Sequence, residues 1–194
     1  MRNSERGYQN EFRIIGGKWR RRRLKFPTLP GIRPSPDRVR ETLFNWLQER
    51  IAGARCLDLF AGSGALGLEA LSRGAANCVF VDREAEVIEA LRVHLKTLHA
   101  PSGDLVRADA MRYLAGPSSQ FDLVFLDPPF DSALLESVLA RLLTGAWLAP
   151  GARVYLECAA GRVPELPAGW VMLRQARAGK VEFGLAAAGE SPSA

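Results

Sequence analysis

The chain has 194 residues, of which 47% are hydrophobic, and its formal net charge is +5. This length allows one well-buried domain with a small appendage and excludes two full domains. The N-terminus lacks a signal-peptide-type apolar run and no segment is long enough to span a bilayer, so we expect an unprocessed, cytoplasmic protein without a membrane partner.

The charge is unevenly distributed along the chain. Residues 1–40 contain 12 Lys and Arg against 3 acids, whereas the remainder contains 14 against 18. The basic end suggests a polyanionic partner, and the mildly acidic body suggests a cationic cofactor. The three cysteines, Cys56, Cys78 and Cys158, are an odd number without paired spacing, which is typical of a reduced protein without a disulfide framework or zinc site.

Residues 1–34 are predicted to form a basic arm and a linker. Phe12–Gly17 and Lys18–Phe26 have the pattern of a small β-hairpin that turns at Gly16-Gly17. Arginines that neutralise phosphates, interleaved with aromatic rings that stack on unpaired bases, favour RNA binding over the alternative, a solvated charge run on a mobile tail. The aromatic residues are Tyr8, Phe12, Trp19 and Phe26. The predicted RNA-binding residues are Arg13, Lys18, Trp19, Arg20, Arg21, Arg22, Arg23, Lys25, Arg33, Arg38 and Arg40.

A helix is predicted to follow the proline-rich connector at residues 27–36. Ser35 offers a capping hydroxyl, Pro36 suits the first helical position, and Asp37 places an acid in the first turn. The apolar face predicted to pack on the domain comprises Val39, Leu43, Trp46 and Leu47. Away from it lie Arg38, Arg40 and Asn45, either as plain surface or as an extension of the RNA footprint.

From Arg55 onward, strand and helix patterns alternate, which predicts an α/β fold with parallel strands and right-handed crossovers. Strands are predicted near residues 55–60, 78–82, 104–107, 121–126 and 152–158. Helices are predicted near 65–73, 84–98 and 132–143, with a turn or two at 110–115. A loop around Pro164 and Pro167 precedes a hairpin of Val171–Arg177 and Lys180–Ala187. Residues 35–188 would form the main domain, and residues 189–194 a disordered tail.

A glycine-rich turn follows the first strand of this domain. Gly62, Gly64 and Gly67 match G-x-G-x-x-G, which could hold a dinucleotide pyrophosphate at a helix N-terminus. Asp58, just upstream, would repel a pyrophosphate but attract the ammonium group of S-adenosylmethionine (SAM). A nicotinamide oxidoreductase is also disfavoured because the sequence offers no evident proton-transfer group.

Acids end four of the predicted strands, at the edge where open parallel sheets bind ligands. Asp82 would accept from ribose hydroxyls, Asp109 from the adenine amino group, and Asp58 would face the methionine ammonium. Each acid has the alternative role of a helix cap. The predicted cofactor site comprises Asp58, Phe60, Ala61, Gly62, Gly64, Asp82, Arg83, Asp109, Ala110 and Asp127.

Asp127-Pro128-Pro129-Phe130, directly after a buried strand, are the predicted catalytic residues. The prolines end the ladder because each lacks an N–H and fixes its own φ. The Asp127 carboxylate and the Pro128 carbonyl would then orient the N–H groups of an exocyclic amine, and Phe130 would stack on the base. The alternative is a proline turn with a buried Phe. No metal site is predicted, and His94 and His99 have no catalytic pattern.

Together these motifs resemble the RsmD family of bacterial enzymes, which methylate the N2 amine of a guanine in small-subunit (16S) ribosomal RNA. The resemblance runs from about Phe12 to Leu185 and rests on Arg13–Gly17, Arg33–Leu47, Asp58–Gly64 and Asp127–Phe130. One departure is that the family commonly has a glycine among the basic residues after Trp19, where this chain has Arg20–Arg23.

The resemblance implies a Rossmann-like class I methyltransferase fold. Its parts would be a seven-stranded, mostly parallel sheet with a C-terminal antiparallel hairpin, and a small N-terminal β-hairpin arm. It also implies SAM as cofactor and 16S ribosomal RNA in the assembling small subunit as substrate; a monomer is the default state.

The sequence leaves two other functions open. One is another amino-methyltransferase, acting on adenine N6 of DNA or glutamine N5 of a protein. The other is a non-catalytic RNA-binding assembly factor that keeps the fold without the activity. The basic arm favours a nucleic acid over a protein, and the intact motifs favour an enzyme.

Overall fold

The computed structural model describes residues 10–30, 32, 34–129 and 132–188. Its strands are β1 (Asn10–Arg13), β2 (Arg23–Phe26), β3 (Arg55–Asp58), β4 (Asn77–Asp82), β5 (Gly103–Arg107), β6 (Phe121–Leu126), β7 (Leu148–Ala159), β8 (Val171–Ala178) and β9 (Val181–Ala187). Its α-helices are α1 (Asp37–Trp46), α2 (Ala65–Ser72), α3 (Ala85–Thr97), α4 (Ala110–Leu114) and α5 (Ser132–Thr144). The predicted tail at residues 189–194 lies outside the described residues.

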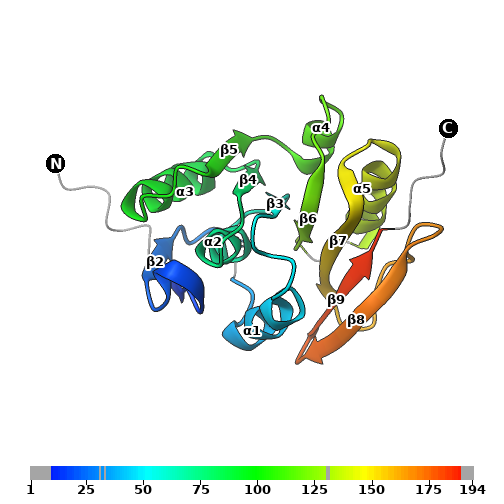
Figure 1. Cartoon of the computed structure of the whole chain (residues 1–194), viewed down its shortest axis with the longest axis horizontal. Coiled ribbons are helices and arrows are strands. Elements are labelled where there is room, and N and C mark those ends of the chain that lie inside the picture. The colour runs from blue at the N-terminus through cyan, green and yellow to red at the C-terminus, as the bar shows by residue number, and fades with distance from the viewer. Residues whose placement is uncertain (1–9, 31, 33, 130–131, 189–194) are drawn as a thin grey trace.

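The main sheet contains seven strands in the order β5-β4-β3-β6-β7-β9-β8 (Figure 1). Its first five strands are parallel, and β9 runs antiparallel to both of its neighbours. This confirms the predicted mostly parallel sheet with a C-terminal hairpin. The chain winds outward from β3 to β5 and then returns to the other side of β3 at β6. The strand order therefore reverses between β3 and β6, where open α/β sheets bind ligands beyond the carboxyl ends of the strands.

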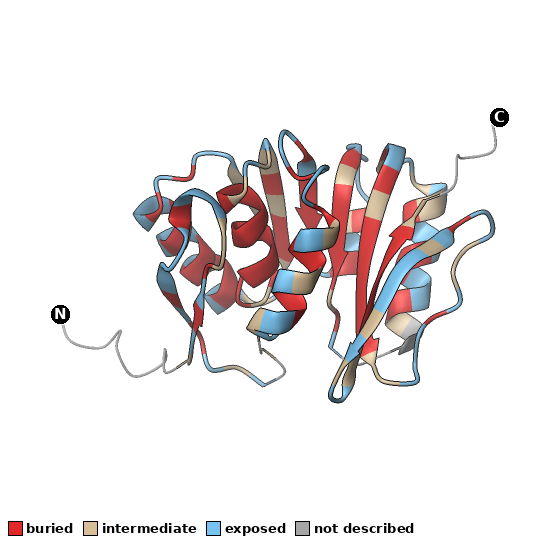
Figure 2. Ribbon diagram, turned by 60° about the horizontal axis from the view of Figure 1, so that its bottom comes forward, coloured by how far each residue is buried: buried red, intermediate tan, exposed pale blue. Residues whose placement is uncertain are grey.

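Helices cover both faces of the sheet, and strand alternation assigns each side chain to a face. Phe80 and Phe125 pack in one core cluster with α1, α2 and α3. Their neighbours Val81 and Val124 pack in a second cluster with α4 and α5. The central strands are therefore buried on both faces (Figure 2). None of the helices among the described residues is long and apolar enough to cross a membrane.

The N-terminal arm is a β1–β2 hairpin that packs against α2 and α3. Its connection is longer than predicted and contains a short 3-10 turn at Gly17–Trp19. The two glycines lie against α2 instead of forming the tip of a tight hairpin. Gly17 has φ +72°, and a Cβ there would lie 1.9 Å from the Ser72 carbonyl oxygen. Among Arg20–Arg23, where the family commonly has a glycine, Arg21 has φ +71°, a conformation that favours glycine.

Helix α1 begins at Asp37, close to the predicted start, but Ser35 does not cap it. Pro36 is the N-cap residue, and no side-chain hydrogen bond caps the helix there. The Ser35 hydroxyl instead points toward the carboxyl ends of β6 and β7, as described below. The apolar face is buried as predicted, with Trp46 half-buried and stacked on Phe183 of β9 at 5.5 Å between ring centroids.

Candidate active site

The glycine-rich turn joins β3 to α2 at the point where the strand order reverses. Gly62 and Gly64 have φ of +50° and +80°, so both occupy the left-handed region that suits glycine. Gly67 serves close packing, because a Cβ there would lie 2.3 Å from the ring of Phe80. Around Gly62 an added Cβ would meet nothing closer than 3.8 Å, which leaves space beside this part of the loop.

Asp58 lies beneath this loop and is only 2% exposed. Its Oδ2 accepts a hydrogen bond from the Gly67 N–H at 2.9 Å, so the carboxylate holds the first turn of α2 against β3. Burial raises the pKa of Asp58 to about 7, against the opposing effect of the Gly67 hydrogen bond. A contact between this carboxylate and the methionine ammonium, direct or through water, stays a prediction. The Gly67 hydrogen bond also gives Asp58 its alternative role, a cap for the helix that follows.

Asp82 and Asp109 end the next two strands at the same edge. Asp82 is half-buried; its Oδ2 accepts from the Gly62 N–H and its Oδ1 from the Glu84 N–H, both at 2.9 Å. Burial raises the pKa of Asp82, while those two amides oppose the rise. Asp109 is exposed and caps α4 by accepting from Met111 N–H at 2.9 Å. A hydrogen bond from either acid to a cofactor stays a prediction.

The remaining predicted cofactor residues lie along this edge. Ala61 is buried in the glycine loop, and its N–H donates to the Val81 carbonyl at 2.9 Å. Phe60 is partly buried against the second core cluster. Arg83 is exposed and pairs with Glu84, and its contact with a cofactor stays a prediction. Ala110, the last of these residues, is buried at the start of α4.

Asp127 and Pro128 follow the last residue of β6, beside the glycine loop. Pro128 is buried, Pro129 is exposed, and Asp127 is half-buried. The Ser35 hydroxyl lies 3.1 Å from Asp127 Oδ2. Burial, and secondly the charge of Glu157, raise the pKa of Asp127 well above its ordinary value. Phe130, predicted to stack on the base, lies outside the described residues.

Sequence reasoning missed three residues around Asp127. These are Ser35 before α1, and Tyr155 and Glu157 on β7. A signal was available, because Glu157 is an acid inside the apolar run Val154–Cys158 at the carboxyl end of a buried strand. Strand alternation places Glu157 on the same face as Tyr155, which packs with α1 to α3.

The basic arm offers a row of exposed cations but no exposed aromatic ring among its described residues. Phe12, Trp19 and Phe26 are 5%, 8% and 2% exposed and pack in the core with α1 to α3. The predicted stacking of these rings on RNA is therefore wrong, because the rings anchor the hairpin; Tyr8 lies outside the described residues. The exposed cations are Arg13, Lys18, Arg20, Arg21, Arg22, Arg23, Lys25 and Arg38. Arg33 also lies outside the described residues.

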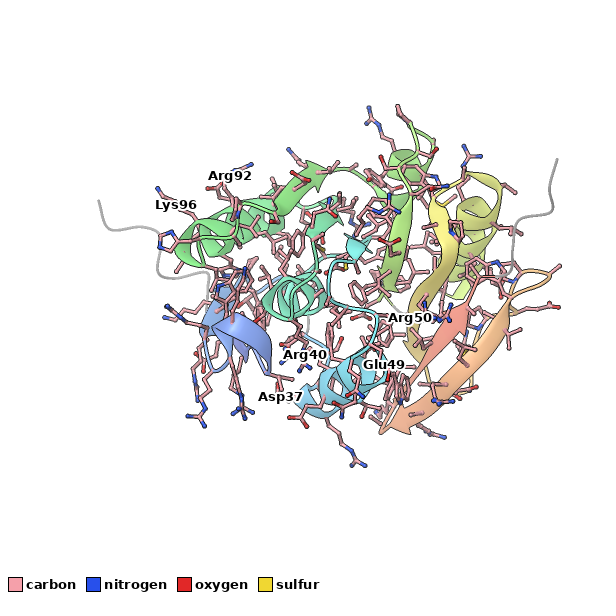
Figure 3. The ribbon with its side chains drawn as sticks, in the orientation of Figure 1. Asp37, Arg40, Glu49, Arg50, Arg92 and Lys96 are labelled. Atoms are coloured by element: carbon pink, nitrogen blue, oxygen red, sulfur yellow. The ribbon has the colours of Figure 1, made fainter. Side chains whose placement is uncertain are left out.

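Arg40 is another correction, because it is 1% exposed and cannot contact RNA. Its side chain points from α1 toward α2 (Figure 3), where Nη1 lies 3.6 Å from Glu69, and Nη2 contacts Asp37 at 2.5 Å. Burial lowers the pKa of Arg40, while Asp37 and Glu69 oppose that change. The helical pattern that placed Arg40 on the solvent side did not account for the packing of the arm and α2 over α1.

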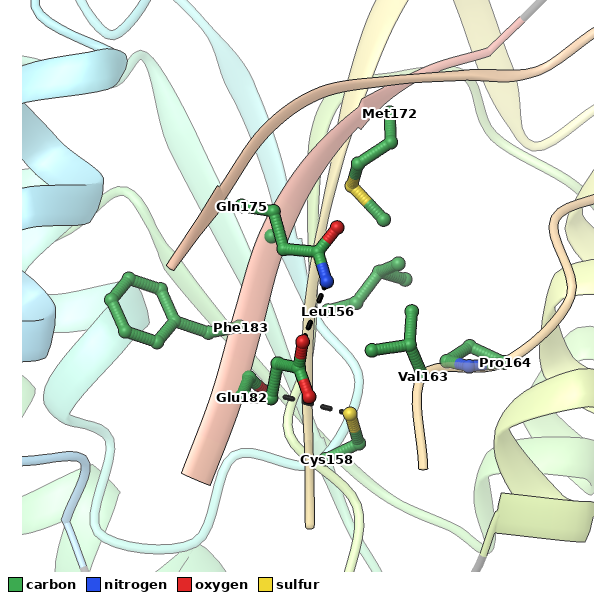
Figure 4. Close-up of a pocket in the computed structure, with 9 residues that line it drawn as sticks. Leu156, Cys158, Val163, Pro164, Met172, Gln175, Glu182 and Phe183 are labelled. Atoms are coloured by element: carbon green, nitrogen blue, oxygen red, sulfur yellow. Dashed lines mark hydrogen bonds between the residues drawn. The ribbon is translucent and has the colours of Figure 1, made fainter. Parts of the chain in front are cut away.

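A small pocket elsewhere is lined mainly by apolar side chains of β7, β8 and β9 and the loop between β7 and β8 (Figure 4). Gln175 Nε2 donates to Glu182 Oε1 at 2.6 Å on its wall. Leu156 and Cys158 line it, so it lies on the opposite face of β7 from Glu157. It is separate from the candidate site. The described residues contain no group of three or more His, Cys, Asp and Glu that could hold a metal ion.

Comparisons with known proteins agree with this architecture. The model of the family described as conserved hypothetical protein 95 matches residues 12–187. Ribosomal RNA small subunit methyltransferase D of Escherichia coli K12 is 45% identical over 186 residues, which are 95% of this chain and 94% of the relative. A solved structure, a putative methyltransferase yhhF from Escherichia coli, has a TM-score of 0.86 at 44% identity and covers 92% of this chain and 98% of its own. A putative methyltransferase complexed with SAH shares the fold, with a TM-score of 0.67 at 15% identity, over 85% of this chain and 54% of its own.

Proposed function

The chain belongs to the RsmD family of ribosomal RNA methyltransferases, and from this premise we propose that it uses SAM to methylate the exocyclic N2 amine of one guanine in 16S ribosomal RNA. The observation that carries the proposal is the position of Asp127 and Pro128. They follow β6 directly beside the glycine loop that follows β3, at the reversal of strand order. This arrangement brings hydrogen-bond acceptors for the N–H groups of an amine next to the expected cofactor site.

The residues at this edge fit SAM. Asp58, Asp82, Asp127 and Glu157 bring four carboxyl groups to the carboxyl ends of β3, β4, β6 and β7. Such a set suits a ligand that carries an ammonium and a sulfonium, and it disfavours a pyrophosphate. Gly62, with open space beside it, and the Asp82 carboxylate would hold the cofactor, and Asp58 would support the loop from below. When bound, SAM supplies a methyl group activated by the sulfonium.

Asp127 and Pro128 would align the guanine amine. The amine is a poor nucleophile because its lone pair is delocalised into the ring. Two acceptors, the Asp127 carboxylate and the Pro128 carbonyl, would bind its two N–H groups and favour the pyramidal form that attacks. The methylated amine then loses one proton, which the Asp127 carboxylate would accept. Catalysis by alignment of this kind is worth up to about 7–11 kcal/mol in favourable cases.

The exposed cations of the arm and of α1 would bind the RNA backbone. Arg20, Arg21 and Arg22 are exposed, and no described acid forms an ion pair with them, which leaves them available to phosphates. Arg13 and Arg23 are partly neutralised by Asp37 and Glu11. The assembling small subunit, and not free RNA, is the substrate form that the family resemblance supports.

The test is methylation of small subunits taken from a strain that lacks this enzyme. The protein is incubated with labelled SAM, and the modified nucleotide is mapped by mass spectrometry. We expect a single N2-methylguanosine, lost in Asp127→Ala but kept in Asp104→Ala, an exposed acid on β5 that lies outside the site. Cofactor binding should persist in Asp127→Ala. Methylation of DNA adenine or protein glutamine, or cofactor binding without any transfer, would overturn the proposal.

A further inference from the structure

Asp127 belongs to a cluster of four polar side chains. Strand alternation places Tyr155 and Glu157 on the face of β7 that looks toward α1, and Asp127 follows β6, the neighbouring strand. Ser35, from the connector that precedes α1, brings its hydroxyl between the two acids. Its Oγ lies 3.1 Å from Asp127 Oδ2 and 3.0 Å from Glu157 Oε2, and the Tyr155 hydroxyl donates to Glu157 Oε2 at 2.8 Å.

The members of the cluster come from segments up to 122 residues apart in sequence, and three of them are shielded from solvent. Ser35, Tyr155 and Glu157 are 5%, 1% and 5% exposed. No ion pair to Asp127 or Glu157 exists among the described residues, so hydroxyl groups are their donors. A single hydroxyl proton of Ser35 serves two carboxyl groups, and it can be donated to one of them at a time.

The charged and titratable groups that face this cluster come from β3, from β7 itself and from α1. Asp58 of β3 acts on Asp127, and Cys158 acts on Tyr155 from the same strand. Arg40 of α1 reaches only the backbone, where its Nε donates to the Ser35 carbonyl at 3.1 Å. This bond fixes the connector and therefore the place of the Ser35 hydroxyl. Burial also raises the pKa of Glu157.

We propose that Ser35 and Glu157 are positioning residues, which hold the Asp127 carboxylate so that one oxygen is turned to the substrate amine. When the Ser35 hydroxyl donates to Asp127 it binds Oδ2, which leaves Oδ1 for an N–H of the amine. Without Ser35, the carboxylate can rotate about its Cβ–Cγ bond, and the amine loses a fixed acceptor. This inference rests on the proposed methyl transfer and deepens it by naming what orients the reacting group.

The first test compares Ser35→Ala with Ser35→Thr and with Ser119→Ala, an exposed control. A hydrogen bond to a charged group that acts in the transition state is expected to change kcat by about 10- to 100-fold. Ser35→Ala should therefore lower kcat by that factor and leave KM for SAM and for small subunits within about twofold. Ser35→Thr, which keeps a hydroxyl, should restore most of kcat. An unchanged kcat in Ser35→Ala would overturn the proposal.

The second test is the pH profile of Glu157→Gln. Asp127 must be ionised to accept from the amine, so activity falls as the pH drops through its pKa. The charge of Glu157 raises that pKa, and glutamine removes the charge but keeps the shape. The acid limb should therefore move to lower pH in Glu157→Gln and stay in place in Glu165→Gln, an exposed control. An unmoved limb would contradict the proposed role of Glu157.

The two proposals fail in distinguishable ways. A wild-type protein that transfers no methyl group to small subunits refutes the proposed function. An active wild type with an unaffected Ser35→Ala variant refutes only the positioning role. Thermal melting of each variant verifies folding, and if Glu157→Gln does not fold, the Ser35 pair decides the question alone.

Discussion

Replacing Glu69 with leucine should loosen the N-terminal hairpin and strongly destabilise the protein. The Glu69 carboxylate is fully buried in α2 and accepts from the N–H groups of Ile15 at 2.8 Å and Gly16 at 2.7 Å. Arg73 Nε also donates to it at 2.7 Å, and the buried guanidinium of Arg40 lies 3.6 Å away. Leucine has a similar volume, so the change removes the acceptors without opening a large cavity.

The expected loss follows from the groups that would stay behind. Breaking one side of a buried ion pair costs about 3–5 kcal/mol, because the other charge stays buried without its partner. Each backbone N–H left without an acceptor costs about 1–3 kcal/mol, and these losses overlap. We expect the free energy of unfolding to fall by about 3–5 kcal/mol in total, which lowers Tm by roughly 6–20 °C in a chain of this size.

Urea unfolding measures the loss, and limited trypsin digestion reports on the arm. Cleavage after Lys18 and Arg20–Arg23 should accelerate in Glu69→Leu. The control is Glu89→Leu on α3, because Glu89 is exposed and its pair with Arg92 is worth less than about 1 kcal/mol. If Glu69→Leu unfolded within about 1 kcal/mol of wild type, with no faster cleavage, the docking role of Glu69 would be refuted.

Two further predictions concern pH and salt. The folded-state pKa of Asp58, about 7, exceeds its unfolded value, so its contribution to stability is present at low pH and is lost as the pH rises through 7. Asp58→Asn should therefore flatten the fall in the urea midpoint of unfolding between pH 5 and 8. An unchanged slope would exclude Asp58 as the origin of that fall. Replacing Arg20 and Arg22 with glutamine should reduce the salt dependence of RNA binding by about 0.7 log unit per lost contact on single strands. Arg162→Gln, an exposed control in the loop after β7, should leave the slope unchanged, and a double variant that behaves likewise would assign the arm another role.

The sheet could be predicted from sequence because its signals are local. The predicted strands near 78–82 and 121–126 agree with β4 and β6 to within one residue at each end, and the glycine turn placed α2 correctly. β7 is longer than predicted, since it starts at Leu148, and its pairing with β6 is interrupted by a shift in register between Phe121 and Leu123. A bulge of that kind breaks the two-residue alternation of a strand, so the sequence pattern does not predict it.

The predicted stacking role of the aromatic rings of the arm is wrong for a physical reason. An aromatic ring between arginines has the same sequence pattern whether it stacks on a base or fills a core. Alternation offered a signal, because Phe12 and Ile14, and likewise Leu24 and Phe26, are spaced by two and share a face. Such a face requires an apolar partner, and that partner, α2 with α3, lies beyond α1 and β3 along the chain. Arg40 was misplaced for the same reason, because the carboxylate it meets belongs to α2.

Helix α2 connects the two halves of the proposed function. Its first turn holds the glycine loop through Gly67 and Asp58, and its next turns hold the arm through Glu69 and Ser72. All eight of its residues are buried, so neither end can shift without disturbing the core. RNA bound to the exposed arginines would therefore be presented at a fixed distance from the cofactor loop. Under the proposed function, the arm would contribute to the choice of the target base as well as to affinity, because its position relative to Asp127 is set by packing.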